Sequence, residues 1–521
     1  MNPREAFERA KGAGQRIYHF DGGLKLRHHK KVSCQLRVER PPVPAQLTVP
    51  LIQHGGEPTE AAVRPGDRVL KGQVIGRCPS CALLHSPVSG TVEAVQDAPV
   101  ATAAGGRAAA VVIRPDGLDE WVQRKPVADW REASARELCE RIRASGIAGL
   151  GGAVFPSHVK AEAARQRQVH TLILNGAECE PYISCDEMLM REQPAQIVLG
   201  ARILRRAVGA ERVVIAIEDQ MGVVQTALEQ AVAEAGCVSV AVVRVNTIYP
   251  EGGERQLIQA LTGLEVPAGG LPTDIGLVCY NVATAAAVAA ALTAGTPLIE
   301  RYVTVTGNGV SSPRNLLALI GTPLAHLVAA CGGYRPDAAR LVVGGPIMGF
   351  PVASDAVPVS KAVNCVLVLT RQDITAPQAE MPCIRCGECA RVCPARLLPQ
   401  QLHLQLANGL WEQAQDYGLS ACIECGCCDV VCPSHIPLAS GFRRGKAELR
   451  ARAEKARAAE RARRRFESRE ARLAREQRQR EEALQRRKEL LRDQGKRQRD
   501  VQAAIERADK RRQMDGKDDD T

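Results

Sequence analysis

The chain has 521 residues, 45% of them hydrophobic and 3% aromatic, with a formal net charge of +11. This length is enough for several domains with hydrophobic cores. Residues 441–521 carry 28 basic and 17 acidic side chains, which accounts for the whole excess, and the neutral remainder argues against a nucleic-acid-binding body.

The 19 cysteines lack the dense, even spacing of a secreted disulfide scaffold and indicate a reducing compartment. The first five residues, Met-Asn-Pro-Arg-Glu, contain no apolar region, so we predict no secretory signal. The longest apolar run, residues 282–294, is too short to span a bilayer. We therefore expect no membrane-spanning segment, which still allows a peripheral subunit on membrane partners.

After an N-terminal extension (residues 1–31), residues 32–115 are β-branched and punctuated by Gly and Pro, which predicts a small β domain. Two stretches within it resemble the halves of a biotinyl/lipoyl-type barrel. The carrier lysine of that family belongs on the hairpin between them, where this chain has Cys78-Pro-Ser-Cys81. We therefore predict a structural barrel rather than a swinging-arm carrier. The two thiols are either a redox or metal pair or plainly packed side chains.

Residues 130–299 alternate strand-like apolar runs with helical segments, which predicts an α/β domain with a largely parallel sheet. The expected strands are residues 171–174, 213–217, 238–243 and 277–279, and the expected helices include 194–209 and 223–235.

Four Gly- or Asn-rich loops fall near the ends of these strands, where ligands bind in parallel sheets. They are residues 149–156 (followed by Lys160), 175–182, 249–258 and 281–284. Glycines let the backbone approach a phosphate or a flat ring, and helix N-termini favour anions. One such loop is usually only a turn, but four together predict a flavin or nucleotide pocket.

Residues 300–350 contain short strands around one short helix, which predicts a small β-grasp-like insertion. A further strand is expected at residues 363–370. Residues 371–380 form the expected linker into a cysteine-rich domain, which we place at residues 371–440.

Residues 383–394 and 422–433 each follow the C-x2-C-x2-C-x3-C-P pattern that holds a four-iron cluster in bacterial ferredoxins. In two-cluster ferredoxins the cysteine before proline ligates the opposite cluster. The predicted ligand sets are Cys383, Cys386, Cys389 and Cys432 for one cluster, and Cys422, Cys425, Cys428 and Cys393 for the other.

Cys427 lies outside this spacing and is predicted to be a neighbour rather than a ligand. A pair of zinc knots is the alternative, since paired C-x2-C units also suit tetrahedral zinc. The residues between the motifs contain helix-forming runs, so we expect a helical ferredoxin module.

Residues 441–521 are rich in Arg, Glu, Gln and Ala, which predicts a long helix with charge pairs four residues apart. Its leucines are too sparse for a coiled-coil seam. This tail is either a solvated or partly disordered helix, or a basic arm that contacts anionic lipid or an acidic partner.

The order of these parts resembles the C subunit of the Rnf (also Rsx) ion-translocating electron-transport complex, over residues 18–440. The α/β part also resembles the flavin-bearing, NADH-oxidising subunit of respiratory complex I. The resemblance implies a multidomain α/β fold. Its parts are a lipoyl-like barrel, a Rossmann-like FMN/NADH domain, an SLBB-like β-grasp insertion, a helical two-cluster ferredoxin domain and a charged C-terminal helix.

The loops of that complex I subunit are matched here with some departures. Val154 replaces one glycine of its G-x-G-G-A-G-F-P-x-x-x-K loop, and Ala177 replaces the aspartate of its N-A-D-E-S-E-P loop. Tyr249 begins an altered version of its Y-x-x-G-E-E loop. The matched positions are Gly149, Gly151, Gly152, Phe155, Lys160, Asn175, Glu178, Glu180, Gly252, Gly253, Glu254, Asn281 and Thr284.

The resemblance assigns roles to these positions but names no catalytic residue. It implies that Lys160 meets the FMN phosphate. Asn175, Asn281 and Thr284 contact the flavin or its phosphate, and Glu178 and Glu180 lie on the nicotinamide side.

The implied chemistry is electron transfer between NADH and a partner. NADH gives up a hydride, which carries two electrons. FMN accepts both electrons and passes them one at a time to two [4Fe-4S] clusters. The implied partners are other subunits of the complex, including an iron–sulfur acceptor subunit, or a ferredoxin. Other subunits move the ion, and the chain is placed peripherally on the cytoplasmic face of the inner membrane.

Two other interpretations stay open. The replacement of an aspartate by Ala177 and the altered Tyr249 loop favour a flavin-free iron–sulfur scaffold that conducts electrons from another subunit. The third is a zinc-binding adaptor.

Overall fold

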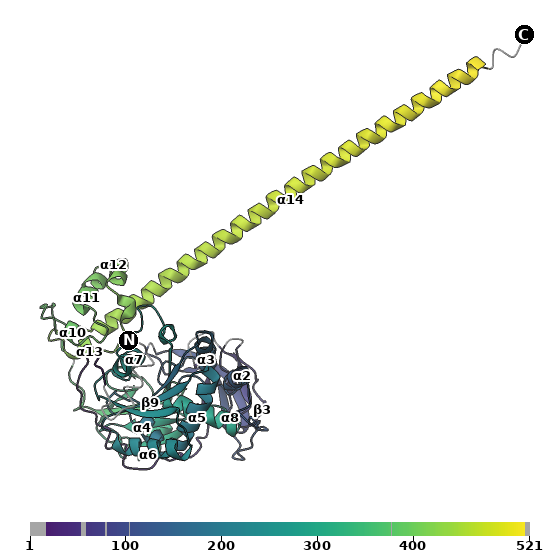
Figure 1. Cartoon of the computed structure of the whole chain (residues 1–521). Helices are drawn as coiled ribbons and strands as arrows, with labels where there is room; N and C mark the ends of the chain where they lie inside the picture. Colours follow the sequence, from purple (N-terminus) through teal and green to yellow (C-terminus); the bar gives the residue numbers. More distant parts are fainter. Residues whose placement is uncertain (1–16, 54–58, 79–80, 104, 377, 516–521) are drawn as a thin grey trace, which may run out of the picture. The chain divides into compact units, whose positions relative to one another are not determined.

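The computed structural model describes residues 17–53, 59–78, 81–103, 105–376 and 378–515. The chain divides into two units, residues 1–443 and residues 444–521, and each is described by itself. Figure 1 labels the elements.

The N-terminal β domain consists of two small antiparallel sheets. One sheet has the strand order β1 (Leu47–Pro50), β7 (Arg107–Pro115), β6 (Gly90–Pro99) and β3 (Arg68–Val69), and the other has the order β2 (Glu60–Ala61), β4 (Val74–Arg77) and β5 (Leu84–His85). Leu47, Ile75 and Ile113 are fully buried in the core that these strands enclose. The β domain expected at residues 32–115 is therefore present.

The α/β domain is built on a four-stranded parallel sheet. Its strands are β8 (Thr171–Asn175), β9 (Arg212–Glu218), β10 (Val240–Val245) and β11 (Leu277–Asn281), in the order β10-β9-β8-β11. All four expected strands form. β10 begins two residues later than expected, because Val238 is 91% exposed and lies outside the sheet.

Helices cover both faces of this sheet. They are α2 (Ala135–Ala144), α3 (Ser157–Gln166), α4 (Cys185–Glu192), α5 (Pro194–Val208), α6 (Gly222–Glu234), α7 (Glu254–Thr262) and α8 (Val282–Thr293), with a short 3-10 helix at Pro272–Ile275. Strand side chains alternate between the faces. Leu172 and Leu174 pack in the core that contains α5 and α8, whereas Ile173 packs in the core that contains α7. Figure 1 shows α5 and α8 side by side.

The order of the strands reverses between β8 and β11. The chain runs from β8 through β9 to β10 in one direction and then returns to place β11 on the other side of β8. The two strands end in register, with Asn175 beside Asn281. Ligands of doubly wound sheets bind in the crevice at such a reversal, so the topology places the candidate site at these two asparagines.

The β-grasp-like segment is a five-stranded sheet with one helix. Its strands are β12 (Glu300–Thr306), β13 (Arg314–Leu319), β14 (Ala338–Val343), β15 (Phe350–Pro351) and β16 (Cys365–Thr370), and its helix is α9 (Leu324–Ala330). β16 lies in the centre and pairs with both β12 and β14. The strand expected separately at residues 363–370 therefore completes this sheet, which extends beyond residue 350.

The cysteine-rich segment is helical. It contains α10 (Glu388–Arg391), α11 (Pro399–Ala407), α12 (Trp411–Asp416), a 3-10 turn at Leu419–Ala421 and α13 (Cys427–Val430). Gly387 precedes α10 at φ 82° and Gly426 precedes α13 at φ 74°, so the two motifs fold alike.

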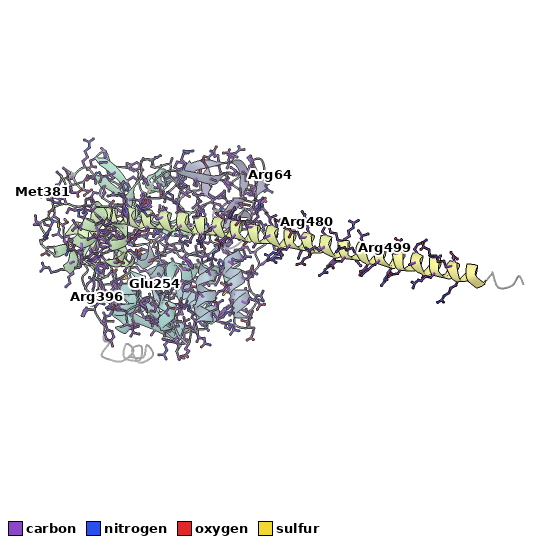
Figure 2. The ribbon with its side chains drawn as sticks, turned by 90° about the horizontal axis from the view of Figure 1, so that it is seen from above. Arg64, Glu254, Met381, Arg396, Arg480 and Arg499 are labelled. Carbon is purple, nitrogen blue, oxygen red and sulfur yellow. A yellow bond between two sulfur atoms is a disulfide. The ribbon has the colours of Figure 1, made fainter. Side chains whose placement is uncertain are left out.

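The second unit is the greater part of α14 (Leu438–Asp515). Ion pairs four residues apart join Arg452 to Glu448 and Arg464 to Glu460, each at 2.8 Å. Figure 2 shows Arg480 and Arg499 projecting from the helix. Across the described residues, none of the helices combines the length and the hydropathy needed to cross a membrane.

Candidate functional site

The Gly-rich loop (residues 149–156) packs its backbone over the end of β11. The amide of Leu150 donates to Thr284 Oγ1 at 3.0 Å, and Thr284 is fully buried in the first turn of α8. A Cβ on Gly151 would lie 3.2 Å from the Cβ of Asn281. Gly152 has φ +101° and open space beside it. The loop therefore presents bare backbone to the crevice.

Two other residues shape this loop. The amide of Gly149 donates to the carbonyl of Phe155 at 2.8 Å and closes the turn. Phe155 itself is 49% exposed, and Val154 takes φ +48° where the related loop has glycine. That conformation is costly for a valine. The turn nevertheless keeps this shape with Val154 in place of the glycine.

The two asparagines at the ends of β8 and β11 hold the loops around the crevice. Asn281 accepts from the amide of Ala283 at 2.8 Å, which caps α8, and it donates to Asp186 Oδ2 at 2.5 Å. Asn175 donates to the carbonyl of Gly252 at 2.8 Å. The capped N-terminus of α8 lies at the end of β11 beside the Gly-rich loop, and the helix dipole favours an anion there.

Lys160 connects the Gly-rich loop to the loop after β10. Its ammonium lies 2.5 Å from Glu254 Oε1, and the two side chains are 30% and 39% exposed. A pair this exposed is held weakly, so Lys160 remains able to meet another anion. Gly252 has no room for a Cβ, because it would lie 2.7 Å from the carbonyl of Ala177. A Cβ on Gly253 would lie 2.6 Å from Oε1 at the end of the Gln256 side chain.

Glu178 faces the N-terminus of α4. Its carboxylate accepts from the amides of Asp186 at 3.1 Å and Glu187 at 3.3 Å, and from Cys185 Sγ at 3.3 Å. Burial raises the pKa of Glu178 to about 8, and the carboxylate of Asp186 adds to the effect. These bonds make Glu178 a support for α4.

Glu180 joins the loop after β8 to the β-grasp segment. Its Oε1 accepts from the amides of Ile347 at 2.8 Å and Met348 at 3.0 Å. A Cβ on Gly345 would clash with Glu180. Burial raises the pKa of Glu180. The predicted nicotinamide-side glutamates are thus both engaged within the protein.

Three buried ionisable side chains lie beside these loops, and only Glu251 falls within one of the predicted loops. Lys30 donates to the carbonyl of Glu178 and lies 3.7 Å from Glu218 Oε2. Glu218 at the end of β9 and Glu251 in the loop after β10 are 1% and 2% exposed, and each has one carboxylate oxygen without a hydrogen-bond partner. In the sequence, Lys30 cannot be told apart from its neighbour Lys31.

Glu251 should make stability depend on pH. Burial raises its pKa to about 8, and the carboxylates of Glu218 and Asp219 add to the effect. Between about pH 4.5 and about pH 8 the folded chain keeps a proton that the unfolded chain has lost. Its free energy of unfolding therefore falls by up to about 1.4 kcal/mol per pH unit and levels off above about pH 8.

The variant Glu251→Gln removes this titration. In thermal unfolding at one heating rate, the wild-type midpoint should fall relative to that of the variant as pH rises to about 8, and then run parallel to it. Parallel midpoints across the whole range would show that Glu251 is ionised in the folded chain.

The cysteines gather around two cavities. The first cavity is lined by Cys383, Cys386, Cys389 and Cys432, and the second by Cys393, Cys422, Cys425, Cys427 and Cys428. The structure therefore brings together the four thiols of each predicted ligand set, including the crossing of the two cysteines that precede proline. Four converging thiols fit a [4Fe-4S] cluster in each cavity.

Left-handed residues cause the cysteines to converge. Arg385 and Gly387 have φ 56° and 82° in the first motif, and Glu424 and Gly426 have φ 58° and 74° in the second. Such residues between neighbouring cysteines turn the backbone into a concave loop. Arg and Glu at these positions gave no signal in the sequence, where only the spacing of the cysteines and prolines indicated the two sites.

The second cavity adjoins the loop after β10. The hydroxyl of Tyr249 donates to the carbonyl of Cys425 at 2.5 Å, and Tyr249, Cys425 and Cys427 belong to one buried cluster with Cys179 and Ile347 partly around it. In contrast, Cys383 and Cys386 of the first cavity are exposed.

The N-terminal segment also ties these parts together. Leu24 and Tyr249 exchange backbone hydrogen bonds of 2.7 and 2.9 Å, and the amide of Gly23 donates to the carbonyl of Val392 at 3.0 Å. Residues 17–30 thus lie between the α/β domain and the cysteine-rich segment, a position that the sequence did not suggest.

Three family models match successive parts of the chain. The RnfC barrel sandwich hybrid domain matches residues 18–118, the Nuo51 FMN-binding domain matches residues 142–290, and the SLBB domain matches residues 302–351.

Three curated relatives from different bacteria are each named as the C subunit of an ion-translocating oxidoreductase complex. The protein of Pseudomonas aeruginosa is 47% identical over 436 residues, which cover 83% of this chain and 56% of that protein. The protein of Edwardsiella ictaluri is 44% identical, over 84% of this chain and 54% of that protein. The protein of Rhodobacter capsulatus is 42% identical, over 83% of both. The chain thus spans about half the length of the first two relatives.

Among solved structures, an NAD+-reducing [NiFe]-hydrogenase in the air-oxidized state is similar over 55% of this chain and 54% of that chain. The TM-score is 0.43 and the sequence identity is 21%.

Proposed function

Because this chain belongs to the family of C subunits of the ion-translocating oxidoreductase complex, we propose that it carries electrons between NADH and a protein partner through FMN and two [4Fe-4S] clusters. The observation that carries the proposal is the contact between Tyr249 and Cys425, which sets one thiol-lined cavity against the crevice of the FMN-binding type of domain. Such adjacency is what electron transfer between two cofactors requires.

The crevice suits FMN. Gly149, Gly151 and Gly152 carry no side chain where a flat ring would lie, the N-terminus of α8 favours a phosphate, and Lys160 can turn to it. When bound, FMN would accept one hydride, which carries two electrons, and release these electrons one at a time. The chain's own part is to orient the ring with its loops. Burial raises the pKa of Glu251 to about 8, so its carboxyl can hold a proton close to these loops.

The two cavities have different surroundings, so we assign them different positions in the electron path between FMN and the partner. The second cavity, with Cys425, lies next to the crevice and would hold the cluster that exchanges electrons with FMN. The first cavity, with the exposed Cys383 and Cys386, would hold the cluster that faces the partner. Nothing in this order fixes a direction, so the same path can oxidise NADH or reduce NAD.

We propose an iron–sulfur subunit of the same complex, or a ferredoxin, as the partner. Other subunits would move the ion. The chain would lie peripherally on the cytoplasmic face of the inner membrane through these partners, aided by the basic residues of α14.

A flavin-free electron-conducting scaffold is the second candidate. Ala177 stands where the related flavin loop has an aspartate, and Lys160 already has Glu254 as a partner. Both observations weaken the hold on FMN without affecting the thiol-lined cavities.

Cofactor content separates the candidates. We expect anaerobically purified chain to release about one FMN on acid extraction and to contain about eight iron atoms. NADH should bleach the flavin absorbance and then the cluster absorbance. Iron without flavin would favour the scaffold, zinc without iron would favour the adaptor, and bound FMN that NADH leaves unbleached would contradict NADH as donor.

A further inference from the structure

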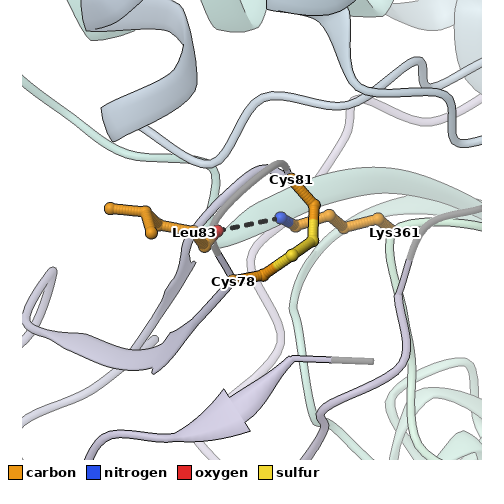
Figure 3. The surroundings of a disulfide bond; sticks show 4 residues. All are labelled: Cys78, Cys81, Leu83 and Lys361. Carbon is orange, nitrogen blue, oxygen red and sulfur yellow. Dashed lines mark hydrogen bonds between the residues drawn. A yellow bond between two sulfur atoms is a disulfide. The ribbon is translucent and has the colours of Figure 1, made fainter. Parts of the chain in front are cut away.

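The hairpin between β4 and β5 is closed by a disulfide between Cys78 and Cys81 (Figure 3). Both residues are buried, at 3% and 2% exposure, and their Cα atoms are 5.4 Å apart. The other 17 cysteines of the chain are free thiols. Among the described cysteines this pair therefore forms the one disulfide, and eight of the other 17 are the predicted cluster ligands.

The disulfide is poorly suited to act as a structural staple. A cross-link stabilises a fold mainly by constraining the unfolded chain, and the effect grows with the length of the closed loop. Cys78 and Cys81 are only three residues apart, so their bond constrains very little chain. A C-x-x-C pair in a chain full of free thiols is more typical of a reversible redox site.

Leu83, two residues after Cys81, is in contact with a buried lysine from another domain. Lys361 is 1% exposed, and its ammonium donates to the carbonyls of Leu83 at 3.4 Å and Gly146 at 2.6 Å. Figure 3 shows the Lys361 side chain running past the disulfide to reach Leu83. The hairpin that carries the disulfide is thereby fixed to Gly146, three residues before the Gly-rich loop.

A second set of bonds continues from Lys361 into the Gly-rich loop. The carbonyl of Lys361 accepts from Arg301, whose other guanidinium nitrogen donates to the carbonyl of Leu150 at 3.2 Å. Gly146 has no freedom to move toward the hairpin, because a Cβ there would clash with the carbonyl of Leu83. The hairpin and the loop are therefore in contact through closely packed, buried groups.

We propose that Cys78 and Cys81 form a reversible dithiol–disulfide site whose closed form holds the base of the Gly-rich loop. The oxidant would be a low-molecular-weight disulfide of the glutathione type. One protein thiolate attacks it and releases one thiolate, and the second protein thiolate then attacks the mixed disulfide and releases another. The protein pair loses two electrons, the small disulfide gains them, and the two thiol protons end on the two released thiols.

The first test is a titration of the whole chain in glutathione buffers of graded ratio, followed by acid quenching and differential alkylation. Trypsin cuts after Arg77 and Arg107, so one peptide holds Cys78 and Cys81 and no other cysteine. As the buffer becomes more oxidising, both thiols of this peptide should become resistant to alkylation together, because they form the disulfide. The thiol of the peptide with Cys237 should stay reduced and open to alkylation. A pair that remains in one state across the range, or that oxidises together with Cys237, would overturn the proposal.

The second test asks whether the pair holds the loop. Amides of residues 149–152 should exchange hydrogen at least about fivefold faster in the reduced chain and in Cys78→Ser than in the oxidised chain. Cys237→Ser is the control and should exchange like the oxidised chain. Equal exchange in all forms would refute the coupling.

The consequence for flavin rests on the proposed function. FMN should bind more weakly to the reduced chain, and by reciprocity bound FMN should favour the disulfide by the same factor as the ratio of the two dissociation constants. A chain that binds no FMN would refute the proposed function while the titration and the exchange data still decide this inference. A chain that holds FMN equally in both states would refute the coupling alone.

Discussion

Replacing Cys386 or Cys425 with alanine should remove about half of the iron from the chain. Each residue lines a different cavity together with the three other cysteines of its predicted set. A cluster that loses one of three closely spaced thiolates is left with an open coordination position. Among the described residues, the first cavity is lined by no further cysteine, and in the second cavity the motif spacing leaves Cys427 outside the ligand set. Iron and acid-labile sulfide per chain measure the loss. A full iron complement in either variant would refute the ligand sets.

The ninth thiol provides a matched control for this experiment. Cys427 and Cys428 both line the second cavity, and Cys427 is fully buried. Because the motif spacing selects Cys428, Cys428→Ala should lose the cluster and Cys427→Ala should keep it. The reverse result would show that Cys427 is the ligand, and the second motif would then differ from the first in its cysteine spacing.

The same two variants also test the order of the clusters. With Cys386→Ala, NADH should still reduce the remaining cluster, since the second cavity adjoins Tyr249 and the crevice. With Cys425→Ala, NADH should bleach the flavin but leave the remaining cluster oxidised for much longer. Electron paramagnetic resonance after mixing with NADH separates these outcomes, and equal reduction in both variants would argue against the proposed order.

The grouping of the cysteines into two sets could be predicted because the geometry is local. Three thiols within seven residues can surround one cluster only if the intervening backbone turns sharply, and the glycine of each motif supplies one such turn at φ 82° or 74°. The crossing of Cys393 and Cys432 followed from the family pattern rather than from any local signal. The parallel sheet was also readable, since its strands are short apolar runs separated by helices.

The remaining site residues were not readable because they depend on tertiary contacts between distant segments. Lys30 lies beside Glu218, and Arg301 reaches Leu150, across 188 and 151 residues of chain. Neither cation has a spacing that sets it apart from an ordinary surface charge. β16 was separated from the β-grasp segment for the same reason, because its partners β12 and β14 come earlier in the chain.

Replacing Gly152 with alanine should weaken FMN binding by about tenfold or more while leaving iron unchanged. Gly152 has φ +101°, a conformation that costs a residue with a Cβ of order 1–3 kcal/mol. The loop can avoid this strain only by moving its backbone away from the crevice, and about 1.4 kcal/mol corresponds to a tenfold loss of affinity. Equilibrium titration of flavin-depleted chain with FMN measures the effect.

Gly149→Ala is the control, because it adds the same methyl group to the same loop without the strain. Gly149 does not have a left-handed φ, and its added Cβ would meet only the backbone of Phe155 at 3.6 Å, an ordinary contact. Its FMN affinity should stay within about threefold of wild type. Equal losses in both variants would mean that FMN needs the space beside each glycine rather than the backbone conformation at Gly152. No loss in either variant would move the flavin away from this loop, and the cavity beside Tyr249 would then need another electron donor.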